Sequence, residues 1–117
     1  MMKTLNDYQE EIVKFDVHGN RRDIEAIDLP FLDKVLGLSG EAGEVSDKVK
    51  KLIRDKDGRL TSTDKENIAK ELGDVLWYVA TTARYIGIDL ENIAKNNIEK
   101  LEDRKARGVI KGNGDNR

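Results

Sequence analysis

The sequence predicts an all-α protein, and its composition and periodicity support that prediction. Charged residues make up 38% of the 117-residue chain, aromatic residues only 5%, and there is a single proline. Such a composition favours helices over sandwiches or barrels. Apolar residues recur at helical spacing in four segments joined by short loops, so we expect antiparallel helices in a four-helix bundle-like arrangement.

The first helix is expected over residues 5–17, where Thr4 or Asn6 can cap its start. Its apolar residues lie three to four positions apart, so they share one face. That face carries Leu5, Tyr8, Ile12 and Phe15.

The second and third helices follow a loop over residues 18–28. The second is expected over residues 30–54, because its proline, Pro30, is favoured in a first turn. Thr63 and Glu66 form a capping-box pattern that would open the third helix. Gly87 is expected to end it in the left-handed conformation.

The fourth helix is expected to start at Asp89 as its cap and to end near Gly108. The polar, glycine-containing tail over residues 107–117 is expected to be flexible, or to close over a substrate. A chain of this length supports one hydrophobic core, so residues 1–117 are predicted to form a single domain.

Charge and residue usage exclude several classes of protein. The net charge is −2, which gives no electrostatic footprint for nucleic acid. No stretch is long and apolar enough to span a bilayer, so we expect a soluble, cytoplasmic protein without a membrane partner. The chain has no cysteine and one histidine, His18, which excludes cysteine zinc sites and multi-histidine cages.

Two segments of the chain resemble each other. "LSGEAGEVSDKV" from Leu38 aligns with "IAKELGDVLWYV" from Ile68 without a gap, which suggests a duplicated helix unit. At about 100° per residue, each segment forms one apolar stripe that we expect in the core, with its acids on one shoulder. The stripes are Leu38, Ala42, Val45, Val49 and Leu52, and Ile68, Leu72, Val75, Val79 and Ile86.

The acids at matching positions are Glu41 with Glu71, and Glu44 with Asp74. Acid pairs at this spacing are common on solvated helix faces, and either pair alone would be read that way. If the stripes pack face to face, however, the four carboxylates converge. Each close pair then repels by about 4 kcal/mol at an effective dielectric constant of about 20, unless a proton or a cation intervenes. All-oxygen ligands select hard cations such as Mg²⁺.

Glycines and an apolar excess point to a further contact. Gly40, Gly43 and Gly73 lie inside expected helices, where each costs about 0.5–1 kcal/mol relative to alanine, so we interpret them as sites of close backbone approach. Trp77 and Leu76 extend the apolar surface of the third helix beyond one stripe. We therefore predict a homo-oligomer built partly on this helix.

The fourth helix carries polar residues on its apolar side. Asn97 and Arg104 fall close to the centre of its stripe, and Lys100 lies on the shoulder. One interpretation is a satisfied buried amide with basic chains that reach solvent. The other is that the three side chains direct hydrogen bonds and positive charge towards a polyphosphate.

These residues resemble the MazG-like members of the all-α nucleoside triphosphate pyrophosphohydrolase superfamily. The shared signature is E-x-x-E, a spacer and E-x-x-D, present here in "GEAGEV" and "ELGDVLWYV". The resemblance extends from the "YQ" of Tyr8 and Gln9 to "NIEKLEDR". It implies hydrolysis of a nucleoside triphosphate to the monophosphate and pyrophosphate, with a role in cleansing the nucleotide pool. It also implies Mg²⁺, with Mn²⁺ as an alternative, at four catalytic acids: Glu41, Glu44, Glu71 and Asp74.

The same resemblance implies substrate contacts and an assembly. Tyr78 would contact the nucleotide, and the phosphates would meet Lys48, Asn97, Lys100 and Arg104. We add the hypothesis that Lys111 and Arg117 of the tail close over the bound phosphates. The implied assembly is a homodimer or homotetramer.

Other readings stay open. Within the superfamily, a phosphoribosyl-ATP pyrophosphohydrolase or a dUTPase-type relative would differ in substrate. A non-catalytic helical interaction oligomer would leave the repeated acids unexplained. Residues 53–64 partly imitate an EF-hand calcium loop, although Ile53 stands at its first ligand position.

Overall fold

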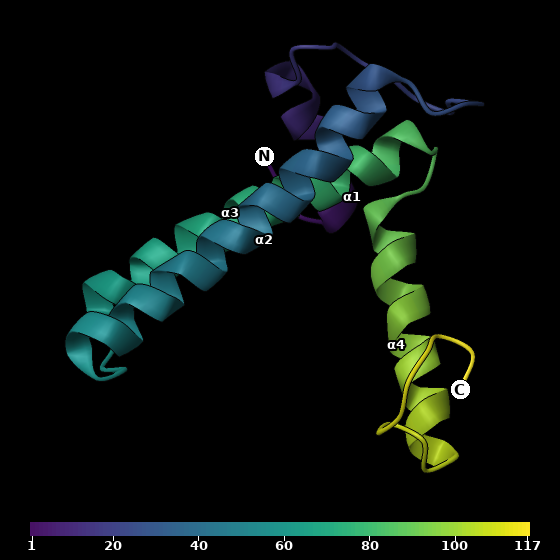
Figure 1. Ribbon diagram of the computed structural model, residues 1–117. Coiled ribbons are helices and arrows are strands. Elements are labelled where there is room, and N and C mark those ends of the chain that lie inside the picture. Colours follow the sequence, from purple (N-terminus) through teal and green to yellow (C-terminus); the bar gives the residue numbers. More distant parts are fainter.

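The computed structural model describes residues 1–117 and is entirely helical, which confirms the predicted all-α class (Figure 1). Four α-helices and one 3₁₀ turn follow one another along the chain. They are α1 (Leu5–Glu11), η1 (Ile12–Phe15), α2 (Leu29–Lys56), α3 (Ser62–Tyr85) and α4 (Leu90–Ala106). None of these helices is both long enough and apolar enough to cross a membrane.

The first two α-helices begin where their caps predict. The Thr4 hydroxyl accepts a hydrogen bond from the Asp7 backbone N–H, and the Asp7 carboxylate accepts one from the Thr4 backbone N–H, so a capping box opens α1. The helix ends earlier than expected, because the chain tightens into η1 at Ile12. Asp28 caps α2 by accepting from the Phe31 N–H at 2.9 Å, and α2 runs on to Lys56.

The predicted start of α3 is wrong, because the helix begins two residues earlier than expected. The capping box joins Thr61 and Asp64, not Thr63 and Glu66. Asp64 is fixed there by a second partner, Lys56 at the end of α2, whose Nζ lies 3.0 Å from its carboxylate. Gly87 ends α3 with φ of 74°, as expected.

The start of α4 is held by α1. Asp89 occupies the cap position but its side chain makes no capping hydrogen bond. The free N–H groups of Leu90 and Glu91 instead donate to the side chains of Gln9 and Asn6, both at 3.0 Å. Asp89 therefore has the predicted cap position, but the acceptors that satisfy the first N–H groups of α4 come from α1.

Gln9 joins three parts of the chain. It is almost fully buried, and its amide nitrogen donates to the carbonyl oxygens of Ala80 at 3.1 Å and Ile88 at 3.0 Å. Its amide oxygen accepts from the Leu90 N–H. All three partners flank the turn between α3 and α4, so this one side chain fixes the turn.

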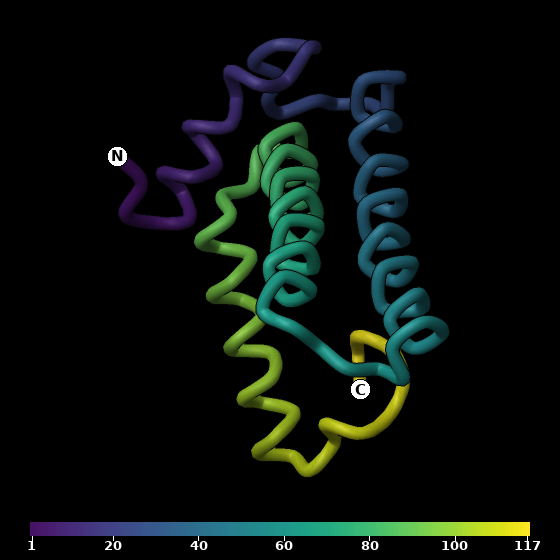
Figure 2. The backbone as a smooth tube through the Cα atoms, turned by 90° about the vertical axis from the view of Figure 1, so that its left-hand side faces the viewer, coloured from purple at the N-terminus to yellow at the C-terminus, as the bar shows by residue number.

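The helices do not close into a bundle within one chain. α2 and α3 run antiparallel side by side along most of their lengths (Figures 1 and 2). α4 leaves the end of α3 at a wide angle, which is visible in Figure 1. The radius of gyration is 17.0 Å, against about 13 Å expected for a compact domain of this length. A single chain therefore provides four bundle-like helices but an open shape.

The hydrophobic core is small and lies at the junction of the helices. Ile12, Ala80 and Leu90 form its centre, with Tyr8 and Trp77 packed against it. Only 10 of the 117 residues are buried. The core therefore joins α1, η1, the second half of α3 and the start of α4, and it leaves most of the α2–α3 pair outside.

The predicted stripes of α2 and α3 are only partly covered. Val49 is 41% exposed, Leu72 is 52% exposed and Ile86 is 50% exposed, so the expectation that these residues form a core is wrong for one chain. In α4 the one buried apolar residue is Leu90 in the first turn, while Ile98 and Leu101 are exposed. Two antiparallel helices cannot cover both sides of an apolar surface that extends around each of them.

A buried ionic network fastens the loop before α2. Lys34 is 2% exposed, and its Nζ lies 3.1 Å from Asp16 and 3.2 Å from Nδ1 of His18. The hydroxyl of Tyr85, at the end of α3, donates to the other oxygen of Asp16 at 2.6 Å. His18 is thus a loop residue that belongs to a structural network.

Candidate functional site

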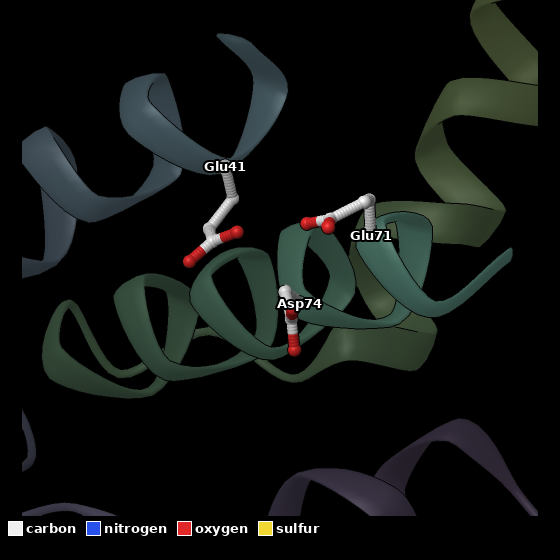
Figure 3. A group of neighbouring side chains, drawn as sticks. All are labelled: Glu41, Glu71 and Asp74. Atoms are coloured by element: carbon white, nitrogen blue, oxygen red, sulfur yellow. The ribbon is translucent and has the colours of Figure 1, made fainter. Parts of the chain in front are cut away.

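Three of the predicted acids converge between α2 and α3. Glu41 extends from α2 towards α3, which carries Glu71 and Asp74 one turn apart (Figure 3). Each of the three offers a carboxylate oxygen, and these atoms all lie within 4.8 Å of one another. The antiparallel pairing of the two repeated segments brings Glu41 to its matching acid Glu71, and Asp74 lies one turn further along α3.

The electrostatics of this cluster are unfavourable without a cation. Burial, followed by the charges of Asp74, Glu71 and Glu44, raises the pKa of Glu41. Burial and the charge of Asp74 likewise raise the pKa of Tyr8, which faces the cluster from α1. Burial is the larger cause of both pKa shifts, and the neighbouring negative charges add to it; a bound cation would relieve this second contribution.

The donor set fits a hard divalent cation. It consists of carboxylate oxygens alone, on two helices, with Glu41 and Glu71 half-buried and Asp74 exposed. Mg²⁺ is commonly bound by one or two carboxylates together with substrate phosphates and water. An open side at Asp74 leaves room for such further ligands.

Glu44 stands apart from the other three. It is exposed and does not belong to the cluster, although its charge contributes to the raised pKa of Glu41. Three residues along a helix correspond to about 300° of rotation, so Glu44 points about 60° away from Glu41. Here that rotation turns it towards solvent.

Lys48 lies beside the acids, as expected for its position. Its Nζ is 3.4 Å from the carboxylate of Glu71, and its side chain is about one-third exposed. The cluster therefore has a positive neighbour on the side nearer to the turn that joins α2 and α3.

On the other side of the acids lies an aromatic hollow. Its volume is about 370 Å³ and its lining consists of Phe15, Glu41, Asp74, Trp77 and Tyr78. Trp77 and Tyr78 meet edge to face with their ring centroids 4.9 Å apart. This is a cavity with aromatic walls and two of the clustered carboxylates at its edge.

Phe15 was missed as a site residue. Its spacing placed it on the core face of the first helix, but it lies in η1 and is 64% exposed. The change from α-helix to 3₁₀ turn at Ile12 rotates Phe15 out of the stripe. The sequence carries no breaker before Phe15 that would have signalled this change.

A glycine contact explains the position of Tyr78. A Cβ added at Gly37 would overlap the Tyr78 ring, so only glycine lets the ring lie against α2. No atom lies within 4 Å of a Cβ built at Gly40, Gly43 or Gly73. Close approach at those three positions is therefore wrong within the chain.

The polar residues of α4 are not brought to the acids. Arg104 is buried against the tail, where its guanidinium donates to the carbonyl oxygen of Asp115 at 2.7 Å. Lys100 pairs with the Asp115 carboxylate at 3.0 Å. Asn97 and Lys100 line a separate hollow on α4. None of the three side chains lines the aromatic hollow, and α4, the helix that carries them, diverges from the α2–α3 pair (Figure 1).

The tail folds back along α4 (Figure 1). Arg117 donates to the carbonyl oxygens of Val109, Ile110 and Gly114. Lys111 is exposed. None of the hydrogen bonds or ion pairs of the tail involves the clustered acids.

The calcium-loop reading finds no support in the geometry. Ile53 to Lys56 are the last turn of α2, so the first half of the supposed loop is helical. Asp55 is engaged by Arg54, and Asp64 by Lys56 and the cap of α3. These carboxylates do not converge.

Comparison with known proteins finds similarity over the segment that contains the acids. The family model described as the MazG nucleotide pyrophosphohydrolase domain matches residues 32–109, a segment that contains all four acids. A protein named "Gene 37 protein" from Mycobacterium phage L5 is 51% identical over 82 residues, which cover 70% of this chain and 72% of the phage protein. No solved structure matches the chain.

Proposed function

Because the chain belongs to the MazG nucleotide pyrophosphohydrolase family, we propose that it hydrolyses a nucleoside triphosphate, an NTP or a dNTP, to the monophosphate and pyrophosphate. The observation that supports this most is the convergence of Glu41, Glu71 and Asp74 at the edge of an aromatic hollow. A hard cation beside a cavity for a planar base is the pairing that such a substrate requires.

Glu41, Glu71 and Asp74 would hold Mg²⁺, or Mn²⁺ in its place. Glu44 would join as a fourth catalytic acid by turning its exposed side chain inwards. The ion would neutralise phosphate charge and polarise the scissile bond. The residues of the chain supply the remaining steps.

In the proposed reaction, a water oxygen forms a bond to the α-phosphorus in line with the bond that breaks. The oxygen that bridges the α- and β-phosphorus atoms leaves with the pyrophosphate. The proton lost by the water passes to a clustered carboxylate and then to solvent.

The aromatic hollow would receive the base. Tyr78 and Trp77 offer ring faces and edges, and Phe15 closes the hollow from η1. Lys48, 3.4 Å from Glu71, would release that carboxylate to the metal and turn to a phosphate oxygen. A hollow that receives a base beside phosphate contacts suits a nucleotide substrate. The role that we propose for this activity is cleansing of the nucleotide pool.

We further propose a homodimer or homotetramer. The small core, the open shape and the exposed stripe residues leave an apolar surface that one chain does not cover. A groove on α2, lined by Val45, Val49 and Ile53, belongs to this apolar surface. Light scattering should therefore give a multiple of 13.2 kDa, and Val49→Glu should reduce it.

In such an assembly, α4 of one copy would serve the acids of another. Asn97, Lys100 and Arg104 project on a helix that diverges from its own acid cluster, so they would contact phosphates across an interface (Figure 1). Mixing two inactive variants tests this proposal. Glu71→Gln and Lys100→Glu chains, unfolded and refolded together, should regain activity, since one site of the mixed oligomer contains only native residues. Activity in neither the mixture nor the separate chains would oppose it.

The tail residues Lys111 and Arg117 would close over phosphates after Arg117 leaves the carbonyl groups that it now contacts. Removing residues 109–117 should then raise KM and lower kcat. Unchanged values of both would end this part of the proposal.

The test of the function is pyrophosphate release from a panel of NTPs and dNTPs, with and without Mg²⁺. Glu71→Gln should abolish release, whereas Glu66→Gln, an exposed glutamate of the same helix, should not. Release from dUTP alone would indicate a dUTPase-type enzyme. Release from phosphoribosyl-ATP alone would indicate the other relative, and no release from any of them would favour the non-catalytic oligomer.

A further inference from the structure

A second cavity lies between α2 and α3, nearer to the turn that joins them. Its volume is about 170 Å³, and three lysines of α2 line it: Lys48, Lys51 and Lys56. From α3 it is lined by Asn67 and Ile68, among others. We call it the lysine pocket. Its residues take no part in the hydrophobic core.

The lysine pocket adjoins the acid cluster. Lys48 lines the pocket and also lies 3.4 Å from Glu71. On α3, Asn67 precedes Glu71 by one turn, which corresponds to about 6 Å along the helix axis, and Asp74 by about 10 Å. A triphosphate chain that starts at the acids can therefore reach the pocket.

The aromatic hollow lies on the opposite side of the acids. It shares Glu41 and Asp74 with the cluster and extends to Tyr78, one turn further along α3. Three features thus follow one another along the α2–α3 pair: aromatic walls, clustered carboxylates and lysines. This is the order of base, reacting phosphate and remaining phosphates in a nucleoside triphosphate.

The charges of the pocket are available to an anion. Of its two aspartates, Asp55 is engaged by Arg54, and Asp64 is engaged by the α3 cap as well as by Lys56. Lys51 and Lys56 are about half exposed in their present ion pairs. The Lys51–Asp47 pair is exposed on both sides, and such pairs contribute at most about 1 kcal/mol, so a highly charged phosphate group can replace it. Asp64 is more buried, but it keeps the backbone N–H of Thr61 as a donor when Lys56 turns to a phosphate.

We propose that the lysine pocket binds the β- and γ-phosphates of the substrate, and therefore the pyrophosphate that leaves. This inference rests on the proposed function and adds an orientation to it. The α-phosphate lies at the acids, and its bond to the bridging oxygen points towards Lys48. The monophosphate stays on the aromatic side after the bond breaks, and the pyrophosphate departs through the open lysine pocket.

Lys50 provides a matched control. It pairs with the same carboxylate as Lys51, since its Nζ lies 3.4 Å from Asp47 and that of Lys51 lies 2.6 Å away. It lines the groove on the other face of α2 instead of the lysine pocket. Removing its charge changes the net charge of the protein as much as either single lysine substitution in the pocket would, and it leaves the pocket intact.

The test is calorimetric titration of the full chain with inorganic pyrophosphate in the presence of Mg²⁺. Lys51→Gln combined with Lys56→Gln should raise the Kd of pyrophosphate about tenfold or more, because two charge-assisted hydrogen bonds are lost. Lys50→Gln should leave it unchanged. The Kd values of the four deoxynucleoside monophosphates should be the same in all three proteins, and circular dichroism should show equal helicity.

Several results would overturn the inference. They are no pyrophosphate binding by the native chain, equal weakening by Lys50→Gln, or a Kd that the double substitution does not change. A parallel loss of monophosphate binding would also count against it. Failure of the proposed function gives a different pattern, in which no nucleotide is hydrolysed while pyrophosphate still binds in a manner that depends on Lys51 and Lys56.

Discussion

The ring of Tyr78 on α3 lies directly against Gly37 on α2, in a space that a single added carbon would fill. This contact sets one wall of the aromatic hollow, because Tyr78 lines the hollow together with Glu41 and Asp74. A residue with no side chain thus fixes the position of a residue proposed to meet the base.

Gly37→Ala should displace Tyr78 and raise KM several-fold with a smaller change in kcat, because the acids are untouched. Gly40→Ala, one turn along the same helix with open space around it, is the control. It should raise the free energy of unfolding by about 0.5–1 kcal/mol. Steady-state kinetics on the best substrate of the panel would show the difference, and equal KM values in both variants would contradict the role of the contact.

Divalent metal should stabilise the native chain through the acid cluster. A ligand that binds only the folded state stabilises it by about 2.7 kcal/mol at 100 times its Kd. Thermal melting with increasing Mg²⁺ should therefore raise Tm for the native chain. Glu71→Gln should melt at a similar temperature without metal and show little rise with it. A full rise in that variant would place the cation elsewhere.

Gln9→Leu should destabilise the fold by roughly 2–4 kcal/mol, because the buried backbone groups of Ala80, Ile88 and Leu90 lose their hydrogen-bond partner. The neighbouring Glu11→Leu replaces an exposed side chain and should change stability by less than about 0.5 kcal/mol. Urea unfolding followed by circular dichroism measures both. We call these hydrogen bonds of Gln9 to Ala80, Ile88 and Leu90 the Gln9 clamp. Similar midpoints for the two variants would show that the Gln9 clamp contributes little to stability.

The Asp16 network should make stability depend on pH in the acid range. Burial alone would raise the pKa of Asp16, but hydrogen bonds from Tyr85, the His18 N–H and Lys34, with the charge of Lys34, outweigh it and lower the pKa. An acid with a lowered pKa contributes stability above its unfolded value, near 3.8, and this contribution disappears as pH falls through the folded value.

Asp16→Asn should therefore be less stable than the native chain at pH 7, and the difference should shrink as pH falls below about 4. The other charged groups that face Asp16 are Lys34 from α2, with Asp33 beside it, and His18 from the loop. Melting curves between pH 2 and pH 7 test this. A constant difference across that range would mean that Asp16 is not the group responsible.

Much of the helical scaffold follows from local signals in the sequence. Helical periodicity and the caps at Thr4 and Gly87 predicted real helix ends, because caps depend on residues that are near in sequence. The approach of Glu41 to Glu71 agrees with the repeat, since antiparallel pairing of two equivalent helices can bring one matching position together.

The rest depends on direction and rotation that spacing does not encode. Glu44 points away because a shoulder position on a helix is satisfied equally well by solvent. The sequence does not predict where the polar residues of α4 lie relative to the acids. The direction of α4 is determined at the Gln9 clamp by hydrogen bonds between residues about 80 positions apart. Phe15 leaves its stripe through a change of helix type, and the lysine pocket arises only where the ends of two helices meet.

The Gln9 clamp has a consequence for any assembly of this chain. The segment that matches the family model begins at residue 32, so Gln9 lies outside it, yet Gln9 determines the direction in which α4 leaves the molecule. The direction of α4, and hence the placement of neighbouring copies that contact it, would then be set by an N-terminal helix that contributes no acid. A change in that helix could alter the geometry between subunits while every residue of the matched segment stayed the same.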